Sequence, residues 1–409
     1  MSNTQDLAIL RDLAKQLAEI AGSDIQEERR ELWRRLNNLE RVRPPVYVRH
    51  GGWEQEVIPP LIKCEDPFYR QHEYNMRFLI FQNSIGDDYV IEPWITQKAS
   101  LILPNDSTWG IPWDVDHGAG GGFHCNPVLK DWEDMSRLVT PKHQVDEAKT
   151  AENVDKITEA VGDIIEIDVD RSPHWSFWHA DISTDLGFLR GQETLLYDVV
   201  MHPDQLHALA AFMRDGILKA QEEAEIAGDW SLSAHQNQAM PYAATLKDPK
   251  ANSGPVKREE LWCYSAAQEF TAIGPAHHDE LLLAYQKPIM EKFGLSAYGC
   301  CEDLSHKIDM LRKVKNLRRI AVSPFADVRK CAEQIGSDYV CSYRPAPWLT
   351  VSHEFDEQRI RDILRRDLAI FREHGCIVDI SLKDVKTVEN DPGRFAKFAQ
   401  IARAAAEEY

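Results

Sequence analysis

The second half of the chain alternates between short apolar segments and amphipathic segments, and this alternation constrains the fold more than any other feature. From residue 230 onward, we expect strands to begin near residues 230, 268, 295, 318, 338 and 376. The segments between them carry apolar residues three and four positions apart, which is typical of helices that cover a sheet. Strands that alternate with helices pair in parallel, so the sequence predicts an α/β fold.

Two further strands, expected near residues 46 and 164, bring the number of βα units to eight. Eight units predict a closed (β/α)8 barrel of the TIM type. An open, doubly wound sheet is the alternative, but its glycine-rich phosphate fingerprint is missing. We expect residues 1–43 to form an N-terminal helical extension and 44–409 to form the barrel, with 50–160 as a large insertion after the first strand.

The charge balance narrows the choice of partners. The chain has 47 Lys and Arg against 66 Asp and Glu, a net charge of −19, which argues against nucleic acid and anionic membranes. It has no apolar run long enough to cross a membrane, and its first residues lack the features of a signal peptide. We therefore expect a cytoplasmic protein. Its 8 cysteines are expected to be free or metal-bound rather than paired.

Two adjacent cysteines mark the end of one expected strand. The strand begins at Leu295 and breaks at Gly299, and Cys300 and Cys301 follow at once, succeeded by two carboxylates. The loop after a strand is where α/β enzymes place their reactive groups. The alternative is a pair of buried core cysteines before a helix that favours acids at its N-terminus. The string of two thiols and two carboxylates favours a functional site.

Thiolate, imidazole and carboxylate ligands for a metal are expected at the end of the barrel where the strands finish, near Cys300 and Cys301. The candidates are Glu269, Cys300, Cys301, Cys341 and His278. The alternative for Cys341 is a buried strand residue, and for His278 a helix cap. His117, His124 and Cys125 flank a glycine run whose spacing matches no standard metal site, so that segment is expected to be a mobile lid or a hairpin.

Other polar and aromatic residues at or beyond the expected strand ends complete the candidate site. Acid–base roles are assigned to Asp303, His235 and Asp327. Substrate binding is assigned to Arg49, His50, Trp113, Trp178, Gln268, Arg344 and Lys383. Lys383 and Asp384 follow the last strand, and a surface ion pair is the alternative to a place in the pocket. Because a barrel brings its strand ends together, most of these residues are expected to share one pocket.

Several motifs resemble the uroporphyrinogen decarboxylase superfamily. The segment from Pro45 to Gly52 resembles the first strand of the decarboxylases, and the segment from Arg190 to Asp198 resembles the one before the long barrel helix. The strand from Leu295 to Cys301 resembles the one that carries His-x-Cys-Gly in the corrinoid-linked methyltransferases, with Tyr298 in the place of the histidine. The resemblance spans about residues 40–405.

The resemblance implies an enzyme that moves a methyl group between a small methoxy-aromatic or methylamine-like substrate and a corrinoid protein. In that case zinc is expected on Cys300 or Cys301, with Glu269 and a histidine or Cys341. A decarboxylase that holds its substrate's carboxylates with Arg49 and Arg344 is the runner-up, and a non-catalytic binding barrel is the third hypothesis. We also expect a homodimer.

Overall fold

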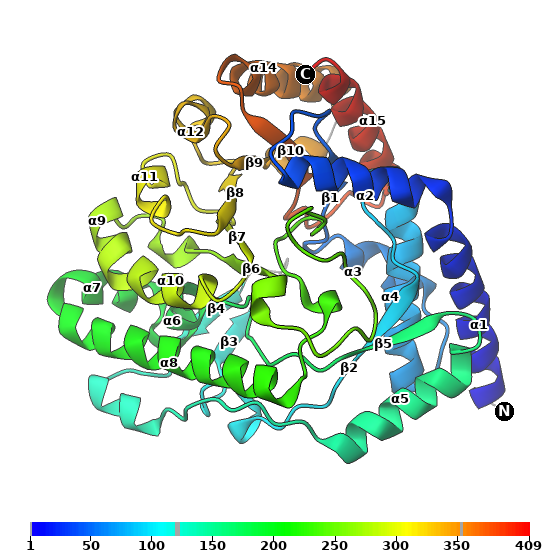
Figure 1. The fold of residues 1–409 in the computed structure, drawn as a ribbon, viewed down its shortest axis with the longest axis horizontal. Coiled ribbons are helices and arrows are strands. Elements are labelled where there is room, and N and C mark those ends of the chain that lie inside the picture. Colours follow the sequence, from blue (N-terminus) through cyan, green and yellow to red (C-terminus); the bar gives the residue numbers. More distant parts are fainter. Residues whose placement is uncertain (1, 119–122, 352–354) are drawn as a thin grey trace.

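Six parallel strands form one curled sheet at the centre of the molecule. The computed structural model describes residues 2–118, 123–351 and 355–409. The strand order is β1-β10-β9-β8-β7-β6. Their bounds are β1 Val46–Val48, β6 Trp262–Ser265, β7 Leu295–Tyr298, β8 Leu317–Val322, β9 Val340–Tyr343 and β10 Ile377–Leu382. The strands follow an arc with helices outside it (Figure 1), so the sheet has the shape of half a barrel.

Two small sheets stand apart from the main one. Strands β2 (Trp94–Lys98) and β5 (Glu166–Asp170) pair in parallel, and β3 (Asp114–His117) and β4 (Phe123–Asn126) form an antiparallel pair. The hairpin expected around the glycine run is therefore present. Residues 119–122 of that run, and the side chain of His117, lie outside the described part of the chain.

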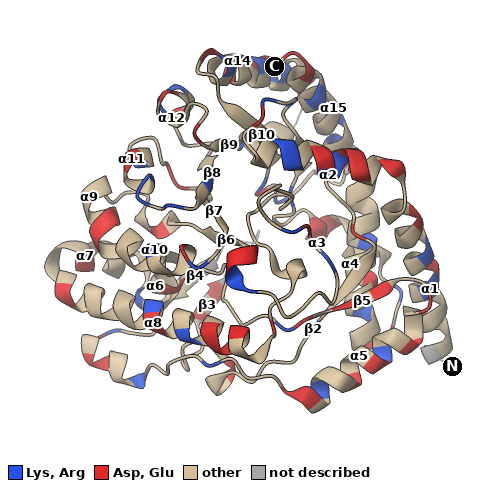
Figure 2. Ribbon diagram, in the orientation of Figure 1, with Lys and Arg blue, Asp and Glu red and all other residues tan. Residues whose placement is uncertain are grey.

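The helices surround the sheet, as the amphipathic segments between the expected strands predict. They are α1 Ser2–Ala21, α2 Asp24–Asn37, α3 Glu54–Val57, α4 Pro67–Ile85, α5 Glu147–Val161, α6 Ser183–Arg190, α7 Gln192–Met201, α8 Pro203–Ala227, α9 Pro275–His278, α10 Ala284–Met290, α11 Ile308–Leu311, α12 Val328–Ile335, α13 Trp348–Val351, α14 Glu357–Glu373 and α15 Gly393–Glu407. Acidic and basic residues are spread along these helices (Figure 2). Within the described residues, no helix is long and apolar enough to cross a membrane.

Local sequence signals explain several helix ends. The Asp66 carboxylate caps α4 by accepting a hydrogen bond from Phe68 N, and Pro67 occupies the first turn. Gly86 ends the same helix in the left-handed conformation, at φ 74°. Asp327 and Asp356 cap α12 and α14 in the same way as Asp66 caps α4. These caps explain why the helices begin and end at these residues.

A closed barrel of eight strands is not confirmed, and three of the expected strands account for the difference. The strand expected near residue 164 is β5, but it pairs with β2 outside the main sheet. The strands expected near residues 230 and 268 are single 3-10 turns, Leu232–Ala234 and Gln268–Phe270. Strand β6 lies in the loop between them. All of its residues are buried in the core, and its backbone pairs in parallel with β7.

Irregular chain covers both edges of the curled sheet. At one edge, Asp88 N donates to Val46 O over 2.7 Å. At the other, Ala180 N donates to Tyr264 O over 3.3 Å. Each bond pairs a backbone carbonyl of an edge strand that a neighbouring strand would pair in a closed barrel.

The two faces of the sheet differ in polarity because side chains alternate along each strand. In β10, Val378, Ile380 and Leu382 belong to the large apolar core under the outer helices. The alternate residue Asp379 lies on the opposite face, where its carboxylate accepts from Arg319 Nη2 at 2.6 Å. Arg319 also donates to the side chain of Asn37 at the end of α2. The N-terminal extension thus closes one end of the concave face, and its boundary at residue 43 stays a prediction.

Candidate functional site

The carboxyl ends of three strands bring the candidate site together. Cys300 and Cys301 follow β7, Arg344 follows β9, and Lys383 follows β10. Gly299 turns the chain between β7 and the cysteines at φ 101°. A Cβ there would lie 2.6 Å from Leu304 Cδ1, so this turn requires glycine. The backbone geometry therefore fixes where the two thiols point.

A lysine ammonium bridges the two thiols and one carboxylate. Lys383 Nζ lies 2.9 Å from Cys300 Sγ and 3.2 Å from Cys301 Sγ. The same nitrogen lies 2.7 Å from Asp384 Oδ2. Cys301 Sγ donates to Asp384 Oδ2 over 3.0 Å, and the two sulfurs are 3.7 Å apart. The Lys383 side chain is 3% exposed and that of Asp384 is 40% exposed, so the cluster opens to solvent on the Asp384 side.

The two thiols differ in charge. The hydrogen bond from Cys301, followed by the charges of Lys383 and Arg344, holds the pKa of Cys300 well below its ordinary value, although burial opposes this. The hydrogen bond to Cys300, together with burial, raises the pKa of Cys301. Of the two side chains, Cys300 is therefore the one that ionises more readily to a thiolate, and Cys301 the one that keeps its proton. The thiolate is the nucleophilic form of cysteine.

Buried polar groups hold the backbone of the cysteine pair. The Glu302 carboxylate accepts from Cys300 N and from Ala267 N, each at 2.7 Å. Tyr264 donates its hydroxyl to Gly299 O at 2.6 Å, and Arg344 Nη1 donates to Cys300 O at 2.5 Å. These contacts orient the thiolate before any ligand arrives, which is what a rigid reactive site requires.

Glu269 supplies a titratable carboxyl near the thiolate. Burial raises the pKa of Glu269 to about 7, while the hydrogen bond from Ser183 lowers it and the charges of Glu302 and Cys300 raise it. Ser183 Oγ donates to Glu269 Oε2 over 2.5 Å. At neutral pH this carboxyl can both take up and release a proton, which suits general acid–base work.

Arg49 faces the same site from the end of β1. Its backbone N donates to Leu382 O over 2.8 Å, so it lies beside the end of β10. Its charge lowers the pKa of Tyr264, although burial raises that pKa overall. Within the described residues, the Arg49 guanidinium makes no hydrogen bond or ion pair. It is free to bind an anionic group. His50, next to it, is exposed and packs edge-on against Phe78.

Three of the predicted metal ligands do not join the thiols. Cys341 faces the outer helices, where it packs in the core with Cys376. His278 Nε2 donates to the Tyr298 hydroxyl at 2.8 Å, and burial lowers the pKa of His278 to about 3. Glu269 is held by Ser183. Within the described ranges, no group of three His, Cys, Asp or Glu residues is arranged to hold a metal ion.

The donor set at the thiols consequently does not fit zinc. A structural or catalytic zinc site needs three or four soft or imidazole ligands around one point. Here the point that faces Cys300, Cys301 and Asp384 is filled by the Lys383 ammonium. The positive charge that stabilises the thiolate comes from lysine in this arrangement.

The predicted acid–base residues have structural contacts elsewhere. His235 Nδ1 accepts from Trp262 N at 3.1 Å, and its Nε2 faces Lys247 O. Asp303 accepts from Ser305 N at 2.8 Å, and Asp327 caps α12. None of these contacts leads to the thiols, so the structure does not bring these three residues into the cluster, and their acid–base roles stay predictions.

The remaining predicted substrate residues divide between two places. Trp178 packs with Cys300 and Cys301 in one apolar cluster and against Tyr264, at 4.9 Å between ring centroids. Trp113 instead stacks on Phe188, with ring centroids 4.3 Å apart. Gln268 lies in a 3-10 turn beyond the end of β6. Arg344 and Lys383 are placed at the cluster, as expected.

Sequence reasoning missed the supporting residues Tyr264, Glu302 and Ser183. Glu302 belongs to the Cys-Cys-Glu-Asp string and could have been chosen from it. Tyr264 could not be chosen from the sequence, because β6 begins six residues before the strand expected near residue 268. Ser183 begins α6, a helix that the sequence pattern does not predict.

Comparisons with known proteins support the fold. No protein-family model matches the chain, and no curated protein matches it. Among solved structures, a methyltransferase from Methanosarcina mazei is similar, with a TM-score of 0.50 over 93% of this chain and 97% of the other. The sequence identity is 10%, so the likeness concerns the fold.

Proposed function

We propose that the chain is an enzyme that moves a methyl group, with the Cys300 thiolate as the nucleophile. The observation that carries the proposal is the Lys383 ammonium, 2.9 Å from Cys300 Sγ and next to the protonated Cys301. A thiolate stabilised in this way is a soft nucleophile, which suits attack on a methyl carbon. The likeness of the fold to a methyltransferase, and the resemblance to the uroporphyrinogen decarboxylase superfamily, support the same proposal and membership of that superfamily.

The first step balances with groups at the site. Cys300 Sγ forms a bond to the methyl carbon of a small methylated substrate, and the bond between that carbon and its heteroatom breaks. The heteroatom leaves with the electron pair, and Cys300 becomes a methyl thioether. Glu269 can supply a proton to the leaving group, since its pKa is about 7. The free Arg49 guanidinium can hold an anionic part of the substrate.

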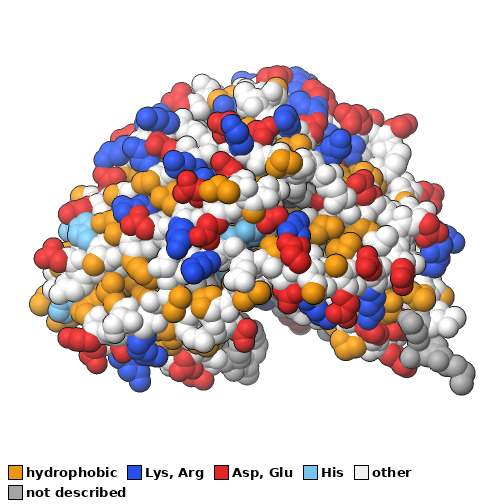
Figure 3. Space-filling model, turned by 60° about the horizontal axis from the view of Figure 1, so that its bottom comes forward, with side chains coloured by type: hydrophobic (Ala, Val, Ile, Leu, Met, Phe, Trp, Pro, Cys, Tyr) orange, Lys and Arg blue, Asp and Glu red, His pale blue; other side chains and the backbone are white. Residues whose placement is uncertain are grey.

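We propose two further partners on the basis of the family resemblance. A corrinoid protein is the proposed acceptor of the methyl group after Cys300, and a homodimer is the proposed assembly. Zinc is not assigned to the thiols, because their donor set does not fit it. Exposed charges of both signs are interspersed on the face shown in Figure 3, so charge alone does not mark a docking surface there.

A decarboxylase is the second candidate, and the free guanidinium of Arg49 favours it. Two free cations would be needed to clamp a carboxylated substrate, but Arg344 already donates to Cys300 O. Release of carbon dioxide that depends on Arg49 and survives Cys300→Ser would support this candidate over methyl transfer.

The test of the main proposal is the mass of the Cys300 peptide after incubation with methylated donors. Methoxybenzoates and methylamines are incubated with wild type, Cys300→Ser and the control Cys64→Ser, whose cysteine packs in a separate apolar cluster and donates to Asp6 O. We expect the wild-type and control Cys300 peptides to gain one methyl group. No gain with any donor, or a gain that survives Cys300→Ser, would contradict the proposal.

A further inference from the structure

The thiols of Cys300 and Cys301 are close enough to react with each other. Their sulfurs are 3.7 Å apart and are free in the structure. Both lie beside one cation, because Lys383 Nζ contacts each of them. A disulfide joins its sulfurs at about 2.0 Å. A modest change in the side-chain torsions and in the peptide between the two residues is therefore enough to bring the sulfurs to bonding distance.

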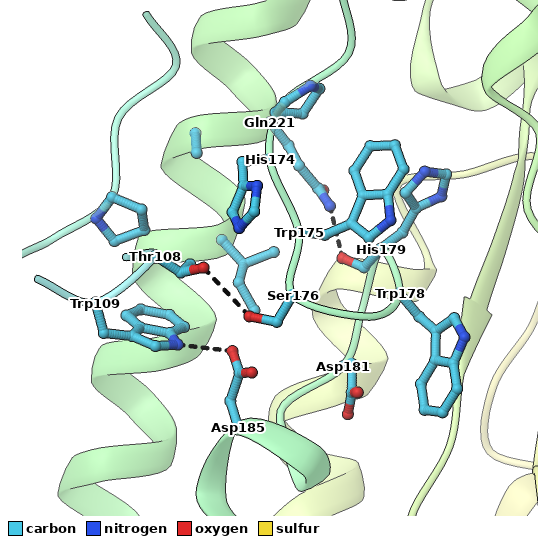
Figure 4. A pocket seen from close by; sticks show the side chains of 14 residues that line it. Thr108, Trp109, His174, Trp175, Ser176, Trp178, His179, Asp181, Asp185 and Gln221 are labelled. Carbon is cyan, nitrogen blue, oxygen red and sulfur yellow. Dashed lines mark hydrogen bonds between the residues drawn. The ribbon is translucent and has the colours of Figure 1, made fainter. Parts of the chain in front are cut away.

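A small molecule can approach this pair from the side of Asp384. The Asp384 side chain is 40% exposed, and Cys301 beside it is partly exposed, whereas Cys300 is 5% exposed. Trp178 packs with both cysteines in one apolar cluster and also lines the narrow cavity between the loop after β5 and α8 (Figure 4). That cavity has room for about one water molecule and offers no route to anything larger. A reagent that reaches the sulfurs must therefore be small.

The two cysteines are suited to different steps of an oxidation. The pKa of Cys300 lies well below its ordinary value and that of Cys301 is raised, so Cys300 is the better nucleophile and Cys301 keeps its proton. A thiol that ionises readily, beside a second cysteine that can resolve its oxidised form, is the usual arrangement of peroxide-sensitive cysteines. Here the second cysteine is the next residue of the chain.

We propose that a small hydroperoxide oxidises Cys300 and Cys301 to a disulfide between these neighbouring residues. Cys300 Sγ first attacks the terminal oxygen of the peroxide. The O–O bond breaks, the leaving oxygen takes up a proton, and Cys300 becomes a sulfenic acid. Cys301 Sγ then attacks the Cys300 sulfur, the S–O bond breaks, and water leaves with the Cys301 proton. In total the two thiols lose two electrons and two protons, and the peroxide becomes an alcohol and water.

This disulfide is expected to be reduced easily. Neighbouring Cα atoms are about 3.8 Å apart, less than the roughly 4.4–6.8 Å that disulfides usually span. The resulting strain favours reduction, and strained, accessible disulfides are the labile ones. The oxidised pair has no thiolate that could accept a methyl group. That consequence rests on the function proposed above, whereas the oxidation itself does not.

A second pair of cysteines provides a comparison within the same molecule. Cys341 and Cys376 interact with each other by a hydrogen bond between their thiols, and both are completely buried in the core. A peroxide dissolved in water does not reach them in the folded protein. We therefore expect this pair to stay reduced under conditions that oxidise Cys300 and Cys301.

Peptide mass spectrometry after treatment with hydrogen peroxide tests the inference. Trypsin cuts after Lys292 and Lys307, so Cys300 and Cys301 stay on one peptide. Thiols that are still free are alkylated with iodoacetamide before digestion. We expect this wild-type peptide to lose two hydrogens and to escape alkylation, and to become alkylated again after treatment with glutathione. The bond between the two buried cysteines of the comparison pair should form at least tenfold more slowly.

Three variants assign the roles. In Cys301→Ser no resolving thiol is left, so the peptide should gain oxygen up to the sulfinic acid, which glutathione does not reverse. In Cys300→Ser the attacking thiol is missing, and the peptide should still be alkylated. The control Cys64→Ser, whose cysteine packs in a separate apolar cluster, should behave as wild type does.

Three results would overturn the inference. They are a wild-type peptide that peroxide leaves unchanged, a wild-type peptide that gains oxygen without losing two hydrogens, and faster bond formation between Cys341 and Cys376 than between Cys300 and Cys301. Because this readout needs no methyl donor, it can succeed while methylation of Cys300 fails, and the reverse.

Discussion

Lys383 is the residue that sets the charge of the thiol pair. Its ammonium contacts both sulfurs and Asp384 and is almost completely buried. A buried charge pair acts more strongly than an exposed one, because water screens it less. Removing this one charge should therefore slow the reactions of the Cys300 sulfur.

We predict that Lys383→Met raises the pKa of Cys300 toward its ordinary value. The alkylation of Cys300 by iodoacetamide at pH 7 should slow by about tenfold, which corresponds to about 1.4 kcal/mol. Peptide mass spectrometry at Cys300 gives the rate. Lys386→Met is the matched control, since Lys386 is exposed and three positions further on. Equal rates for Lys383→Met and wild type would show that lysine does not stabilise the thiolate.

We also predict that Glu269 makes folding depend on pH. Its pKa of about 7 is above the ordinary carboxyl value, so the folded chain binds a proton that the unfolded chain has already released. This contribution to stability is complete below the ordinary pKa of about 4.3 and is lost as the pH rises through about 7. In urea unfolding from pH 5 to pH 8, wild type should lose stability relative to Glu269→Gln. The exposed control Glu259→Gln should follow wild type; parallel curves for Glu269→Gln and wild type would refute the prediction.

Residues at strand ends could be chosen from sequence, but the direction of a side chain within a strand could not. Cys300, Arg344 and Lys383 follow strands, and all three reach the cluster. Cys341 lies inside β9, where a shift of one residue moves a side chain to the other face. It faces the helices, so the expected ligand is a core residue.

At the scale of elements, the turn between β7 and the cysteines is the one most sensitive to substitution. We predict that Gly299→Ala destabilises the fold by about 1–3 kcal/mol, because of its φ of 101° and the close approach of Leu304 and Ala321. Urea unfolding measures the loss. Gly86→Ala is the control, since Gly86 has φ 74° but no atom within 4 Å of the added Cβ. It should cost only the conformational strain of about 1–2 kcal/mol. A smaller loss for Gly299→Ala than for Gly86→Ala would contradict the role of the close contacts.

Helices were easier to predict than strands for a physical reason. Caps such as Asp66 and Gly86 act within one turn of the helix and are visible in the sequence. Strand pairing depends on partners far along the chain. Trp262–Ser265 is an unremarkable four-residue run until β7 lies beside it, whereas the longer run from Trp230 makes only scattered bonds such as Gln236 N to Trp262 O.

At the scale of the whole molecule, one buried ion pair lies on the concave face of the sheet, and its arginine also donates to Asn37 of the N-terminal extension. Arg319 is 1% exposed and Asp379 is fully buried, with a 2.6 Å contact between them. We predict that Asp379→Ala costs about 3–5 kcal/mol of unfolding free energy, because it leaves the guanidinium uncompensated. Asp338→Ala breaks an exposed pair with Arg312 and should cost less than about 1 kcal/mol. Similar losses in the two variants, measured by urea unfolding, would contradict the prediction.

The class of fold followed from the alternation of strands and helices, but closure of the barrel did not. Alternation requires parallel pairing and outer helices, and both are present. The alternation does not determine whether strands from the segment between β1 and β6 pair with the main sheet. Here β5 pairs with β2, and within the described residues only isolated bonds such as Asp88 N to Val46 O extend the main sheet.

The charge of Cys300 in the folded protein is the central claim, and a thiolate titration tests it most directly. The ultraviolet absorbance of thiolate is followed against pH in wild type and in Cys300→Ser, and the difference isolates Cys300. The control Cys64→Ser, whose cysteine packs in a separate apolar cluster, should leave that titration unchanged. We predict that Cys300 titrates well below the ordinary cysteine pKa of about 8.5 and that the wild-type protein carries one thiolate at neutral pH that Cys300→Ser lacks. A difference that titrates at or above the ordinary value would contradict the account.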